Sequence, residues 1–591
     1  MIERLFDIVA ERAAKDPDAE MLAAKENGQW KTYSCKTVWE TAQKLCGGLL
    51  TLGIKNQALE PEAQEKIAII SFNRPEWMMV DLGVQMTGAV LTPIYPTISP
   101  NELTHIFKEA EVKIVFVSNA ELYERFKDAF AEVPSLQHVF SFDQTANVPS
   151  WQTLIEKNAP TDQAVIDRIK PETLATIIYT SGTTGDPKGV MLSHHNIASN
   201  VRDSMPAFTF AEKGSRALSF LPLNHIFERM VTYIYLHAGV AVYYAENMDT
   251  IGANLKEVKP LVFTVVPRLL EKVYERIMAT GIELTGIKRA LFFWALELGK
   301  KFDNVNHGSA WYRFQLAIAN KLVFNKWREA LGGNVKAVVN GSAALQERLI
   351  RIFTAAHVIV MEGYGLTETS PVISVNRYES ENRRVGTVGP LITNVEVKIA
   401  DDGEILAKGP NIMMGYYKKP ELTAEAMKDG WFHTGDIGEW QEGRFLKITD
   451  RKKEIFKTSG GKYVAPQMIE NKLRESPFIE QMMVIGNGRK FVSALIVPNF
   501  GQVKKTLHIS ETDNSKVIRM PEVIALIQKQ LDKYNPLFSH PEQVKKFELL
   551  PDEWTIDAGE LTPSLKIKRK FVEQKYAKIV EGMYGEGQAQ G

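Results

Sequence analysis

Short apolar runs rich in β-branched residues recur along the first two thirds of the chain, and they alternate with longer segments of helical apolar spacing. The runs span residues 66–72, 112–118, 174–180, 261–266, 335–340 and 358–363. Because they are apolar throughout, both faces of each strand are expected to be buried, as in largely parallel sheets. The pattern predicts an α/β fold with layered sheets.

The pattern changes after about residue 385. Short strands separated by turn residues follow, as in VEVKIADDGEILAKGP and GRFLKITDRKKEIFKTSGGKY, and they predict a β-rich subdomain. The last 130 or so residues combine helix and strand patterns again and fit a small α+β domain. A chain of 591 residues exceeds the size of one hydrophobic core, so we expect an N-terminal domain over 1–452 and a C-terminal domain over 453–591.

Composition narrows the class of protein. Lysine and arginine together number 71, and so do aspartate and glutamate, so no overall field attracts the chain to nucleic acid. The two cysteines, Cys35 and Cys46, lie outside any CxxC pattern and are expected to be packed thiols in a reducing compartment. The N-terminal residues lack the apolar core of a signal peptide, and no run approaches about 18 apolar residues. We therefore expect a cytoplasmic protein.

A polar loop follows the apolar run at 174–180. Its glycines, Gly182, Gly185 and Gly189, let backbone amides approach a ligand, and its hydroxyl groups together with Lys188 suit phosphate. The loop is not a Walker A motif, since Lys188 follows a proline and precedes a glycine. Composition alone favours a plain surface hairpin, because glycine, Asp-Pro and Ser/Thr are ordinary turn residues.

The order of these residues is more informative than their composition. The stretch YTSGTTGDPKGVMLSHHN (179–196) resembles, nearly letter for letter, the phosphate-loop signature of the acyl-adenylate-forming (AMP-binding) superfamily. That superfamily includes acyl-CoA synthetases, luciferases and the adenylation domains of peptide synthetases. The resemblance implies that the phosphates of ATP are bound here, by Thr180, Ser181, Gly182, Thr183, Thr184, Gly185 and Lys188.

Two further motifs follow in the order that the superfamily has. VVNGSAAL (338–345) places small residues after a buried strand, where a flat base can lie, and MEGYGLTETSP (361–371) offers Tyr364 for stacking on adenine. Either could be turn chemistry alone, but their register with the phosphate loop argues against that. The resemblance assigns Glu368 and Thr180 to a magnesium ion, which oxygen ligands and phosphates hold. The residues expected to bind ATP or AMP here are Gly341, Ser342, Ala343, Glu362, Gly363, Tyr364, Gly365 and Thr367.

The later motifs supply charged groups. In WFHTGDIGEW (431–440), the carboxylate of Asp436 can accept both ribose hydroxyls, and Arg451 in ITDRKKEIFKTSGGKYVAPQ (448–467) can reach the ribose or the phosphate. The superfamily has its hinge in this second motif, at the position of Lys453, and the resemblance implies that the C-terminal domain rotates there between two half-reactions. Out of context, DRKKE would be taken for a solvated charge run.

Near the C-terminus, GELTPSLKIKRKFV (559–572) resembles the segment with the lysine that stabilises charge during adenylation. Lys566 fits best after Thr-Pro-Ser-Leu, but the segment departs from the commoner glycine-lysine form, so Lys568 stays open as the alternative. A carboxylate that attacks ATP brings two anions together, and Lys566, Lys188 and magnesium would share the task of neutralising them. The resemblance also implies a loop that contacts CoA, with Gly460, Gly461 and Lys462.

The acyl group is expected to bind elsewhere. LPLNHIFERM (221–230) resembles the segment whose histidine lines the acyl pocket, here His225, and VVPRLL (265–270) offers Arg268 to an anion. A core histidine satisfied by backbone is the competing interpretation of His225. The stretch from about 270 to 335 is rich in aromatic and aliphatic residues and predicts two or three amphipathic helices. An insertion of this length resembles the long-chain branch of the acyl-CoA synthetases.

The same insertion bears on membrane contact. Lys288, Arg289, Lys300 and Lys301 flank FFWAL in the manner of an interfacial helix. Aromatic stripes at helical spacing more often mark a core, so a core-packing helical hairpin is the favoured interpretation.

The sequence thus predicts an ATP-dependent ligase that activates a long-chain fatty acid through an acyl-adenylate and transfers the acyl group to CoA, with Mg²⁺ as cofactor. Its catalytic residues are predicted to be Lys566, Lys188, His225 and Glu368. Two alternatives remain: an acyl-AMP ligase that supplies a carrier protein or another acceptor, and a nucleotide-binding regulator without turnover. Contact with the inner face of a membrane, a homodimer, and the length and saturation of the acid are left open.

Overall fold

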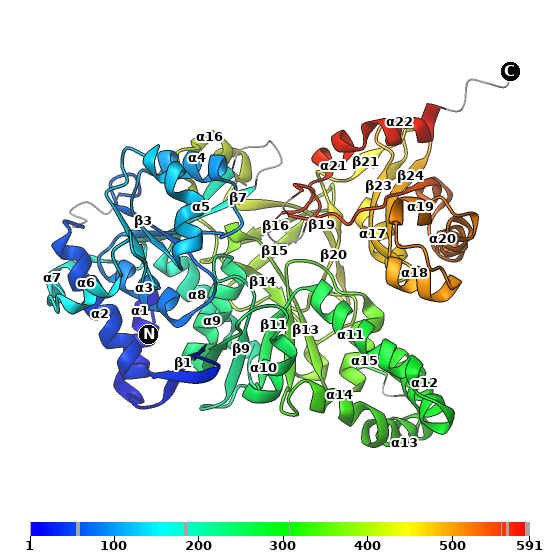
Figure 1. Cartoon of the computed structure of the whole chain (residues 1–591), viewed down its shortest axis with the longest axis horizontal. Helices are drawn as coiled ribbons and strands as arrows, with labels where there is room; N and C mark the ends of the chain where they lie inside the picture. The colour runs from blue at the N-terminus through cyan, green and yellow to red at the C-terminus, as the bar shows by residue number, and fades with distance from the viewer. Residues whose placement is uncertain are drawn as a thin grey trace. The chain divides into compact units, whose positions relative to one another are not determined.

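The computed structural model describes residues 2–54, 60–181, 187–306, 308–556, 558–562 and 566–585 (Figure 1). The chain divides into two compact units. The first comprises Met1–Lys398, Leu406–His433 and Trp440–Lys447, and the second comprises Ile399–Ile405, Thr434–Glu439 and Ile448–Gly591. The second unit therefore begins close to the predicted boundary after residue 452 and also takes up two short strand segments before it.

A seven-stranded sheet lies in the first unit, in the order β17-β8-β7-β4-β3-β5-β6. Strands β7, β4, β3, β5 and β6 pair in parallel, whereas β8 is antiparallel to both β7 and β17. The strands are β3 (Lys66–Ile70), β4 (Val90–Ile94), β5 (Val112–Val117), β6 (His138–Ser141), β7 (Leu174–Ser181), β8 (Pro187–Ser193) and β17 (Gly415–Tyr416).

An eight-stranded sheet has the order β14-β13-β12-β11-β9-β10-β1-β2. Its central strands β13, β12, β11, β9, β10 and β1 run parallel, and β14 and β2 are antiparallel edges. The strands are β1 (Glu20–Glu26), β2 (Gln29–Ser34), β9 (Arg216–Ser219), β10 (Ala241–Tyr244), β11 (Val262–Val265), β12 (Ala337–Asn340), β13 (Ile359–Gly365) and β14 (Val372–Val375).

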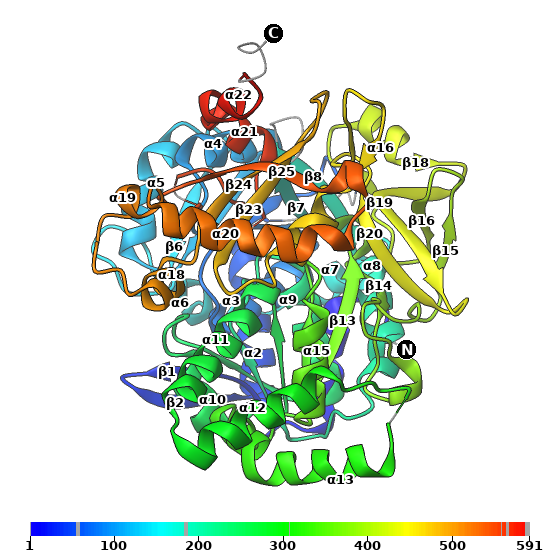
Figure 2. The same ribbon diagram turned by 90° about the vertical axis from the view of Figure 1, so that its right-hand side faces the viewer.

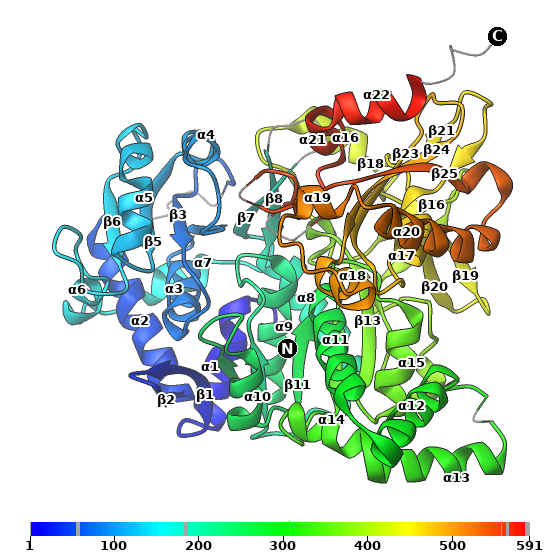
Figure 3. The same cartoon turned by 45° about the vertical axis from the view of Figure 1, so that its right-hand side comes forward.

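Helices fill the space between the two sheets and cover both outer faces (Figure 3). Between the sheets, one shared core contains side chains of α1 (Leu5–Lys15), α2 (Cys35–Thr51), α3 (Pro75–Met86), α8 (His194–Ser204) and α9 (Ile226–Ala238). Outside the seven-stranded sheet lie α4 (Pro100–Ala110) and α5 (Ala120–Ala131). Outside the eight-stranded sheet lie α10 (Ile251–Val258), α11 (Pro267–Glu283), α12 (Gly286–Lys300), α14 (Asn325–Ala330) and α15 (Glu347–Ala355). The unit is thus built of alternating helix and sheet layers, as the apolar pattern predicted.

The alternation of side chains explains how one strand serves two cores. Along β3, Ile67 and Ile69 face the shared core, whereas Ala68 and Ile70 face α4 and α5.

The ends of the helices follow the usual capping preferences. The Ser99 hydroxyl accepts a hydrogen bond from the Glu102 amide at the start of α4. Gly239 ends α9 with φ 83°, a conformation that glycine adopts without steric cost.

The insertion from 270 to 335 forms helices, as predicted. They are α11, α12, α13 (Ala310–Ala319), a π-helical turn (Asn320–Phe324) and α14. In α12 the residues Phe292, Ala295 and Leu296 are buried in the core outside the eight-stranded sheet. The favoured core-packing interpretation of FFWAL is therefore confirmed. Cys35 and Cys46 are both buried in α2, as expected for packed thiols.

A five-stranded sheet contains β15 (Glu396–Ile399), β16 (Glu404–Lys408), β18 (Met427–Lys428), β19 (Trp431–Gln441) and β20 (Phe445–Arg451), and α16 (Pro420–Ala426) precedes β18. Short helices α6 (Gln152–Glu156) and α7 (Gln163–Arg168) lie in the first unit.

The second unit has a three-stranded sheet of β23 (Ile479–Ile485), β24 (Val492–Pro498) and β25 (Val544–Leu549). Its other elements are β21 (Phe456–Lys457), β22 (Tyr463–Val464), α17 (Pro466–Leu473), α18 (Phe500–Leu507), α19 (Asn514–Val517), α20 (Pro521–Tyr534), α21 (Arg569–Lys575) and α22 (Ala577–Gly585). Among the described residues, no helix is both long and apolar enough to cross a bilayer.

Candidate functional site

Several predicted site segments follow neighbouring parallel strands of the eight-stranded sheet. The segment of His225 follows β9, Arg268 follows β11, Gly341 follows β12, and Tyr364 lies in the last part of β13. The register aligns Val265 with Asn340, and Asn340 with Glu362. The predicted residues therefore emerge along one edge, the carboxyl edge, where open α/β sheets bind ligands.

His225 caps helix α9. Its Nδ1 accepts a hydrogen bond from the Phe227 amide at 3.2 Å, so in the neutral ring the proton is on Nε2. Backbone satisfies one of its nitrogens, but the side chain is half-buried and does not lie in the core as the competing interpretation required. The cap therefore fixes the orientation of the ring, and a role in the acyl pocket stays a prediction.

The segment before His225 is held by two asparagines that the sequence did not single out. Asn73, in the loop after β3, accepts from the Leu223 amide at 2.9 Å and donates to the Leu221 carbonyl at 2.6 Å. Asn224 donates to the Ile94 carbonyl at the end of β4 at 2.6 Å. These bonds join the ends of β3 and β4 in one sheet to the predicted acyl segment after β9 in the other.

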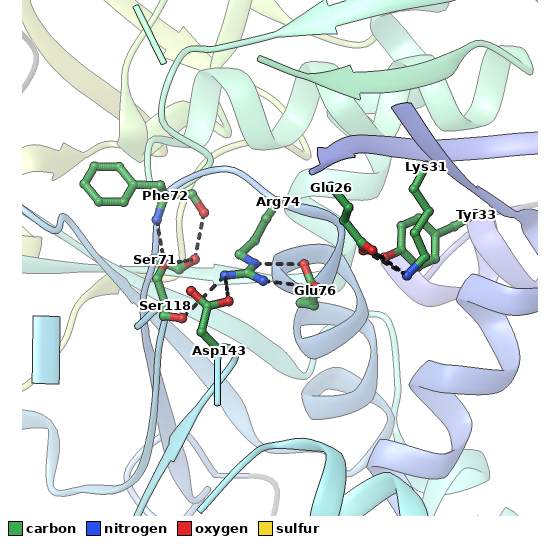
Figure 4. A network of polar contacts seen from close by, with 9 residues as sticks. All are labelled: Glu26, Lys31, Tyr33, Ser71, Phe72, Arg74, Glu76, Ser118 and Asp143. Atoms are coloured by element: carbon green, nitrogen blue, oxygen red, sulfur yellow. Dashed lines mark hydrogen bonds and ion pairs between the residues drawn. The ribbon is translucent and has the colours of Figure 1, made fainter. Parts of the chain in front are cut away.

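The loop that carries Asn73 is itself fixed on both sides (Figure 4). The Ser118 hydroxyl, after β5, donates to the Ser71 hydroxyl at 2.7 Å and accepts from the Phe72 amide at 3.2 Å. Arg74 binds Asp143 at 2.9 Å and Glu76 at 2.8 Å. The network thereby orients Asn73, which is an amide in a polar turn and carries no motif that a sequence reading could have recognised.

The predicted base-binding loop packs directly on the acyl segment. A Cβ on Gly341 would lie 2.7 Å from the Phe227 ring, so only glycine fits there without displacement. Ser342 has φ 70°, the left-handed conformation that non-glycine residues adopt at a cost and that recurs at ligand sites. Ala343 is exposed beside it. The loop is thus narrow, constrained and open to solvent.

Glu362 does not direct its carboxyl group toward the solvent-exposed side of the 341–345 loop. It is buried, and it accepts a hydrogen bond from the Leu345 amide at 2.9 Å. The contact ties the far end of the 341–345 loop to β13. Burial raises the pKa of Glu362 to about 8, so the side chain is expected to be neutral at pH 7. Glu362 therefore shapes the loop, and its predicted contact with the nucleotide stays a prediction.

This raised pKa predicts a pH dependence of stability. The folded protein holds the Glu362 proton more tightly than the unfolded chain, so the stabilisation is complete below about pH 4.5 and is lost as the pH rises through about 8. Between pH 6 and pH 9 the thermal midpoint of the wild type should fall relative to that of Glu362→Gln, which stays neutral. Thermal melts at both pH values measure this. Glu121→Gln, at an exposed glutamate in the first turn of α5, should behave as the wild type; equal slopes for all three proteins would contradict the assignment.

The other predicted residues of β13 and the following turn have distinct surroundings. Tyr364, Thr367 and Gly363 are half-buried, and a Cβ on Gly363 would have ordinary contacts. A Cβ on Gly365 would lie 1.7 Å from the Pro371 carbonyl oxygen, so Gly365 is required by the backbone beside it. Arg268 opens α11 and pairs with Glu271 and Glu275, at 3.6 and 3.4 Å. The roles of these residues toward nucleotide or acid remain predictions.

The phosphate loop connects β7 and β8. Thr180 lies opposite Lys188 in the antiparallel register, and both side chains are half-buried. The predictions for Gly182, Thr183, Thr184 and Gly185 lie outside the described residues, as does the side chain of Ser181. A Cβ on Gly189 would lie 2.8 Å from Ile177, so this glycine serves packing within the hairpin. The described ends of the loop hold Thr180 and Lys188 side by side.

Tyr416 joins this hairpin to Glu368, and the sequence analysis missed it. Strand β17 pairs with β8 so that Tyr416 lies opposite Val190. Its hydroxyl donates to Glu368 Oε1 at 2.9 Å, and the Lys188 ammonium lies 5.0 Å from its ring centroid. Burial, followed by the Glu368 charge, raises the pKa of Tyr416 well above its usual value. One aromatic side chain thus contacts both charged residues, and its two-residue strand is too short for a periodic signal.

In the second unit, Asp436 and Arg451 form an ion pair. Asp436 lies on β19 with its side chain buried, and its Oδ1 is 3.2 Å from Arg451 Nε at the end of β20. Beside them, Lys452 pairs with Asp402 and Glu404. The sequence analysis assigned Asp436 to the ribose and Arg451 to the ribose or the phosphate, and the ion pair brings these two groups together.

The remaining predicted residues of this unit lie on turns. Lys453 is exposed directly after β20. Gly460, Gly461 and Lys462 are exposed in the turn between β21 and β22, where Gly461 has φ 74° and donates to the Thr458 carbonyl at 2.8 Å. A Cβ on Gly461 would meet open space, so its positive φ, and not crowding, accounts for a glycine there.

The two candidate adenylation lysines differ in their backbone setting. Lys566 closes a short loop, since its amide donates to the Thr562 hydroxyl at 3.0 Å and its carbonyl accepts from the Thr562 amide at 2.8 Å. Lys568 precedes α21, and its amide donates to the Glu560 carbonyl at 2.8 Å. Both side chains are exposed. The two lysines thus differ in their backbone contacts, and the choice between them stays a prediction.

Comparison with known proteins agrees with this arrangement. The model of the AMP-binding enzyme family matches residues 9–417, and that of the AMP-binding enzyme C-terminal domain matches residues 453–588. The chain is 33% identical to the long-chain-fatty-acid–CoA ligase FadD15 of Mycobacterium bovis, over 98% of this chain and 96% of that protein. It is 29% identical to long chain acyl-CoA synthetase 4 of Arabidopsis thaliana, over 99% and 92% of the two chains.

Solved structures show the same fold at lower identity. The adenylation domain of a carboxylate reductase from Mycobacterium chelonae has a TM-score of 0.76 at 21% identity and covers 99% of this chain and 91% of its own. A fatty acyl CoA synthetase of Mycobacterium tuberculosis has a TM-score of 0.64 at 19% identity, with 98% and 99% covered. With its carboxyl-edge residues, its β7–β8 hairpin and these matches along nearly its whole length, this chain belongs to the AMP-binding enzyme family.

Proposed function

We propose that this protein is an ATP-dependent ligase that activates a long-chain fatty acid as its acyl-adenylate and transfers the acyl group to CoA, releasing AMP and pyrophosphate. The observation that carries the proposal is the similarity to long-chain-fatty-acid–CoA ligases over 98% of the chain. These relatives are named as CoA ligases, which favours CoA over a carrier protein as the acceptor. A regulator without turnover would have no physical need for the charged set of Lys188, Glu368, Asp436 and Arg451.

The first half-reaction forms a mixed anhydride. A carboxylate oxygen of the fatty acid attacks the α-phosphorus of ATP, and the bond from that phosphorus to the bridging oxygen breaks, so that pyrophosphate leaves. Lys188 and the hydroxyl of Thr180, at the two ends of the phosphate hairpin, are proposed to hold the β- and γ-phosphates. Lys566 is proposed to meet the negative charge that develops during the attack.

The second half-reaction uses the anhydride as acyl donor. The CoA sulfur, after loss of its proton, attacks the acyl carbonyl carbon, and the bond to the phosphate oxygen breaks, so that AMP leaves with the electron pair. Gly460, Gly461 and Lys462 are proposed to contact CoA in this step, and Lys453 to act as the hinge that exchanges them with Lys566. The pair Asp436–Arg451 is proposed to hold the ribose in both steps.

The donor set suits a magnesium ion bound together with ATP. Among the described residues, no group of three or more His, Cys, Asp and Glu side chains is placed to hold a metal. Magnesium, however, commonly takes one or two protein oxygens and completes its shell with phosphate oxygens and water. The Glu368 carboxylate, oriented by Tyr416, and the Thr180 hydroxyl fit that pattern. Bound there, Mg²⁺ would neutralise phosphate charge.

Further parts of the proposal concern the acid and the location. Residues 221–230, with His225 and Phe227, and Arg268 are proposed to line the site of the acid, and each methylene buried there contributes about 0.8 kcal/mol. We also propose a cytoplasmic enzyme that acts at the inner face of a membrane. The homodimer suggested by the sequence analysis stays a prediction.

Pyrophosphate release, measured over saturated acids of increasing chain length, tests the proposal. Release should rise with length to an optimum among long chains, and CoA should accelerate the release of AMP. If no acid supports release, the regulator returns as the explanation. If an acyl carrier protein accelerates AMP release and CoA does not, the acyl-AMP ligase takes its place.

Tyr416→Phe tests the described link between the hairpin and Glu368. The variant keeps the ring beside Lys188 but removes the hydrogen bond to a charged group, which is worth roughly 1.5–3 kcal/mol. We expect adenylation to slow by roughly 10- to 100-fold and the Mg²⁺ concentration for half-maximal rate to rise. Isothermal titration of a non-hydrolysable ATP analogue with Mg²⁺ gives a second readout. Tyr417→Phe, at the neighbouring buried tyrosine, is the control; equal effects of both variants would contradict the role of Tyr416.

A further inference from the structure

One helical segment of the first unit presents apolar side chains to solvent. α13, the π-helical turn and α14 follow one another over residues 310–330, and α13 runs along the border of this unit in Figures 1 and 2. Trp311, Phe314 and Leu322 are 64%, 56% and 48% exposed. Their spacing of three and eight residues places them on one side of a helix. Exposed apolar side chains gathered in this way mark an interaction surface.

The other side of the same segment is anchored in the core. Ala319 and Phe324 are fully buried, and Trp327 is 7% exposed. The Tyr312 hydroxyl donates to the Leu298 carbonyl of α12 at 2.9 Å. Packing of these buried residues accounts for the folding of the segment. It does not explain why Trp311 and Phe314 are aromatic and exposed.

The exposed aromatic pair is preformed. The rings of Trp311 and Phe314 stack with their centroids 5.7 Å apart and an interplanar angle of 26°. Two rings that already pack against each other lose little conformational freedom when a partner covers them, since each has only two side-chain torsions.

Basic residues accompany the apolar ones. Arg313, Lys321 and Lys326 are exposed, and the sole acidic residue between 310 and 330 is Glu329. Among the residues that the structure describes, none of these three cations has a carboxylate within ion-pair distance. In a chain with as many acidic as basic residues overall, this is a local concentration of positive charge.

We propose that Trp311, Arg313, Phe314, Lys321, Leu322 and Lys326, here called the α13 face, dock on the surface of an anionic phospholipid bilayer. Aromatic rings insert at the level of the headgroups, while lysine and arginine reach the phosphates beside them. Anionic lipid also complements the uncompensated charge of the face. The contact thus belongs to α13, and not to the FFWAL stretch of α12, whose aromatic residues are committed to the core.

Flotation of the full chain with lipid vesicles tests the proposal, without ATP, CoA or acid. Vesicles of phosphatidylcholine with phosphatidylglycerol should bind the protein, and vesicles of phosphatidylcholine alone should bind it much more weakly. Replacing Arg313, Lys321 and Lys326 by glutamate should lower binding to the anionic vesicles by about 100-fold or more, since each cation near such a surface contributes about 1 kcal/mol. Trp311→Ser with Phe314→Ser should lower binding by at least about 10-fold.

Matched controls come from α20 and its neighbourhood in the second unit. Ile524 and Leu537 are 42% and 61% exposed, and Lys505, Lys529 and Lys533 are exposed as well. Serine and glutamate replacements of these residues should leave binding unchanged. The proposal is overturned if the wild type does not bind anionic vesicles, if the control variants lose as much binding as the α13 variants, or if sedimentation shows that the α13 face instead joins two copies of the chain. Pyrophosphate release from a soluble acid is measured separately, so failure of the ligase activity and failure of docking are distinguishable.

Discussion

Lys566→Ala should abolish adenylation and leave thioester formation from supplied acyl-AMP largely intact. The ammonium group is proposed to act on charge that develops as the carboxylate attacks ATP, and that charge is absent once the adenylate has formed. Removing one such electrostatic donor typically slows the step by roughly 10²–10³-fold. Single-turnover release of pyrophosphate measures the first half-reaction, and CoA-dependent release of AMP from synthetic acyl-AMP measures the second.

Lys568→Ala is the matched control. The two lysines are both exposed and only two positions apart, but Lys566 closes the loop with Thr562, whereas Lys568 begins α21. We expect Lys568→Ala to keep most of the adenylation rate. A larger loss in Lys568→Ala would transfer the role to that residue, and an equal loss of both half-reactions in Lys566→Ala would exclude a role specific to adenylation.

Asp81→Asn should be strongly destabilising. Asp81 on α3 and Arg229 on α9 form an ion pair in which neither side chain is exposed, with Arg229 Nε 2.9 Å from Asp81 Oδ2. Arg229 also donates to the Thr176 hydroxyl on β7 at 2.9 Å, and the Tyr233 hydroxyl donates to Asp81 at 2.8 Å. Because Arg229 stays protonated, the variant leaves an uncompensated buried charge, which costs about 3–5 kcal/mol.

Urea unfolding, followed by fluorescence, measures this change in the free energy of unfolding of the first unit. Asp81→Leu combined with Arg229→Met removes both charges and should recover much of the loss. Glu26→Gln, at an exposed pair with Lys31, is the control and should cost less than about 1 kcal/mol. A loss below about 1 kcal/mol in Asp81→Asn, or a double variant less stable than the single one, would contradict the expectation.

The cluster has a functional consequence as well. Arg229 lies one turn after His225 on α9, and Thr176 lies on the strand that leads to Thr180 and the phosphate hairpin. The ion pair therefore fixes α9 against α3, and the Arg229–Thr176 hydrogen bond ties α9 to β7. A stable double variant with slower adenylation would show that the charges position these two elements beyond their effect on folding.

The sequence predicted the strands well, because a strand buried on both faces is an apolar run whatever its neighbours are. The runs at 66–72 and 335–340, for example, became β3 and β12. The order of the strands was not predictable, since β9 pairs with β10 and β11 through long-range contacts that no local pattern encodes. The motif residues on the carboxyl edge could be named from resemblance, but not the register that aligns Val265, Asn340 and Glu362.

What the sequence missed has a physical reason in each case. Asn73, Asn224 and Tyr416 act through single hydrogen bonds across elements, and a single polar residue in a turn carries no pattern. In the insertion, α12 and α13 are both amphipathic and rich in aromatic residues. Periodicity alone could not predict which of the two helices packs its aromatic residues against the core. The burial of Glu362 could not be read from its motif, because it depends on the neighbouring strand β12.

The pairing of β17 with β8 has a consequence for how the chain folds. Lys419 Nζ donates to the Pro187 carbonyl at 3.0 Å, across 232 positions of sequence, and Tyr416 reaches the same hairpin from the same segment. During synthesis the hairpin of β7 and β8 is complete long before residue 416 emerges, and until then β8 is an unpaired sheet edge that can pair with another chain. The two-residue strand thus covers an aggregation-prone edge and also supplies the hydrogen bond from Tyr416 to Glu368, so the same short pairing serves both folding and the candidate site.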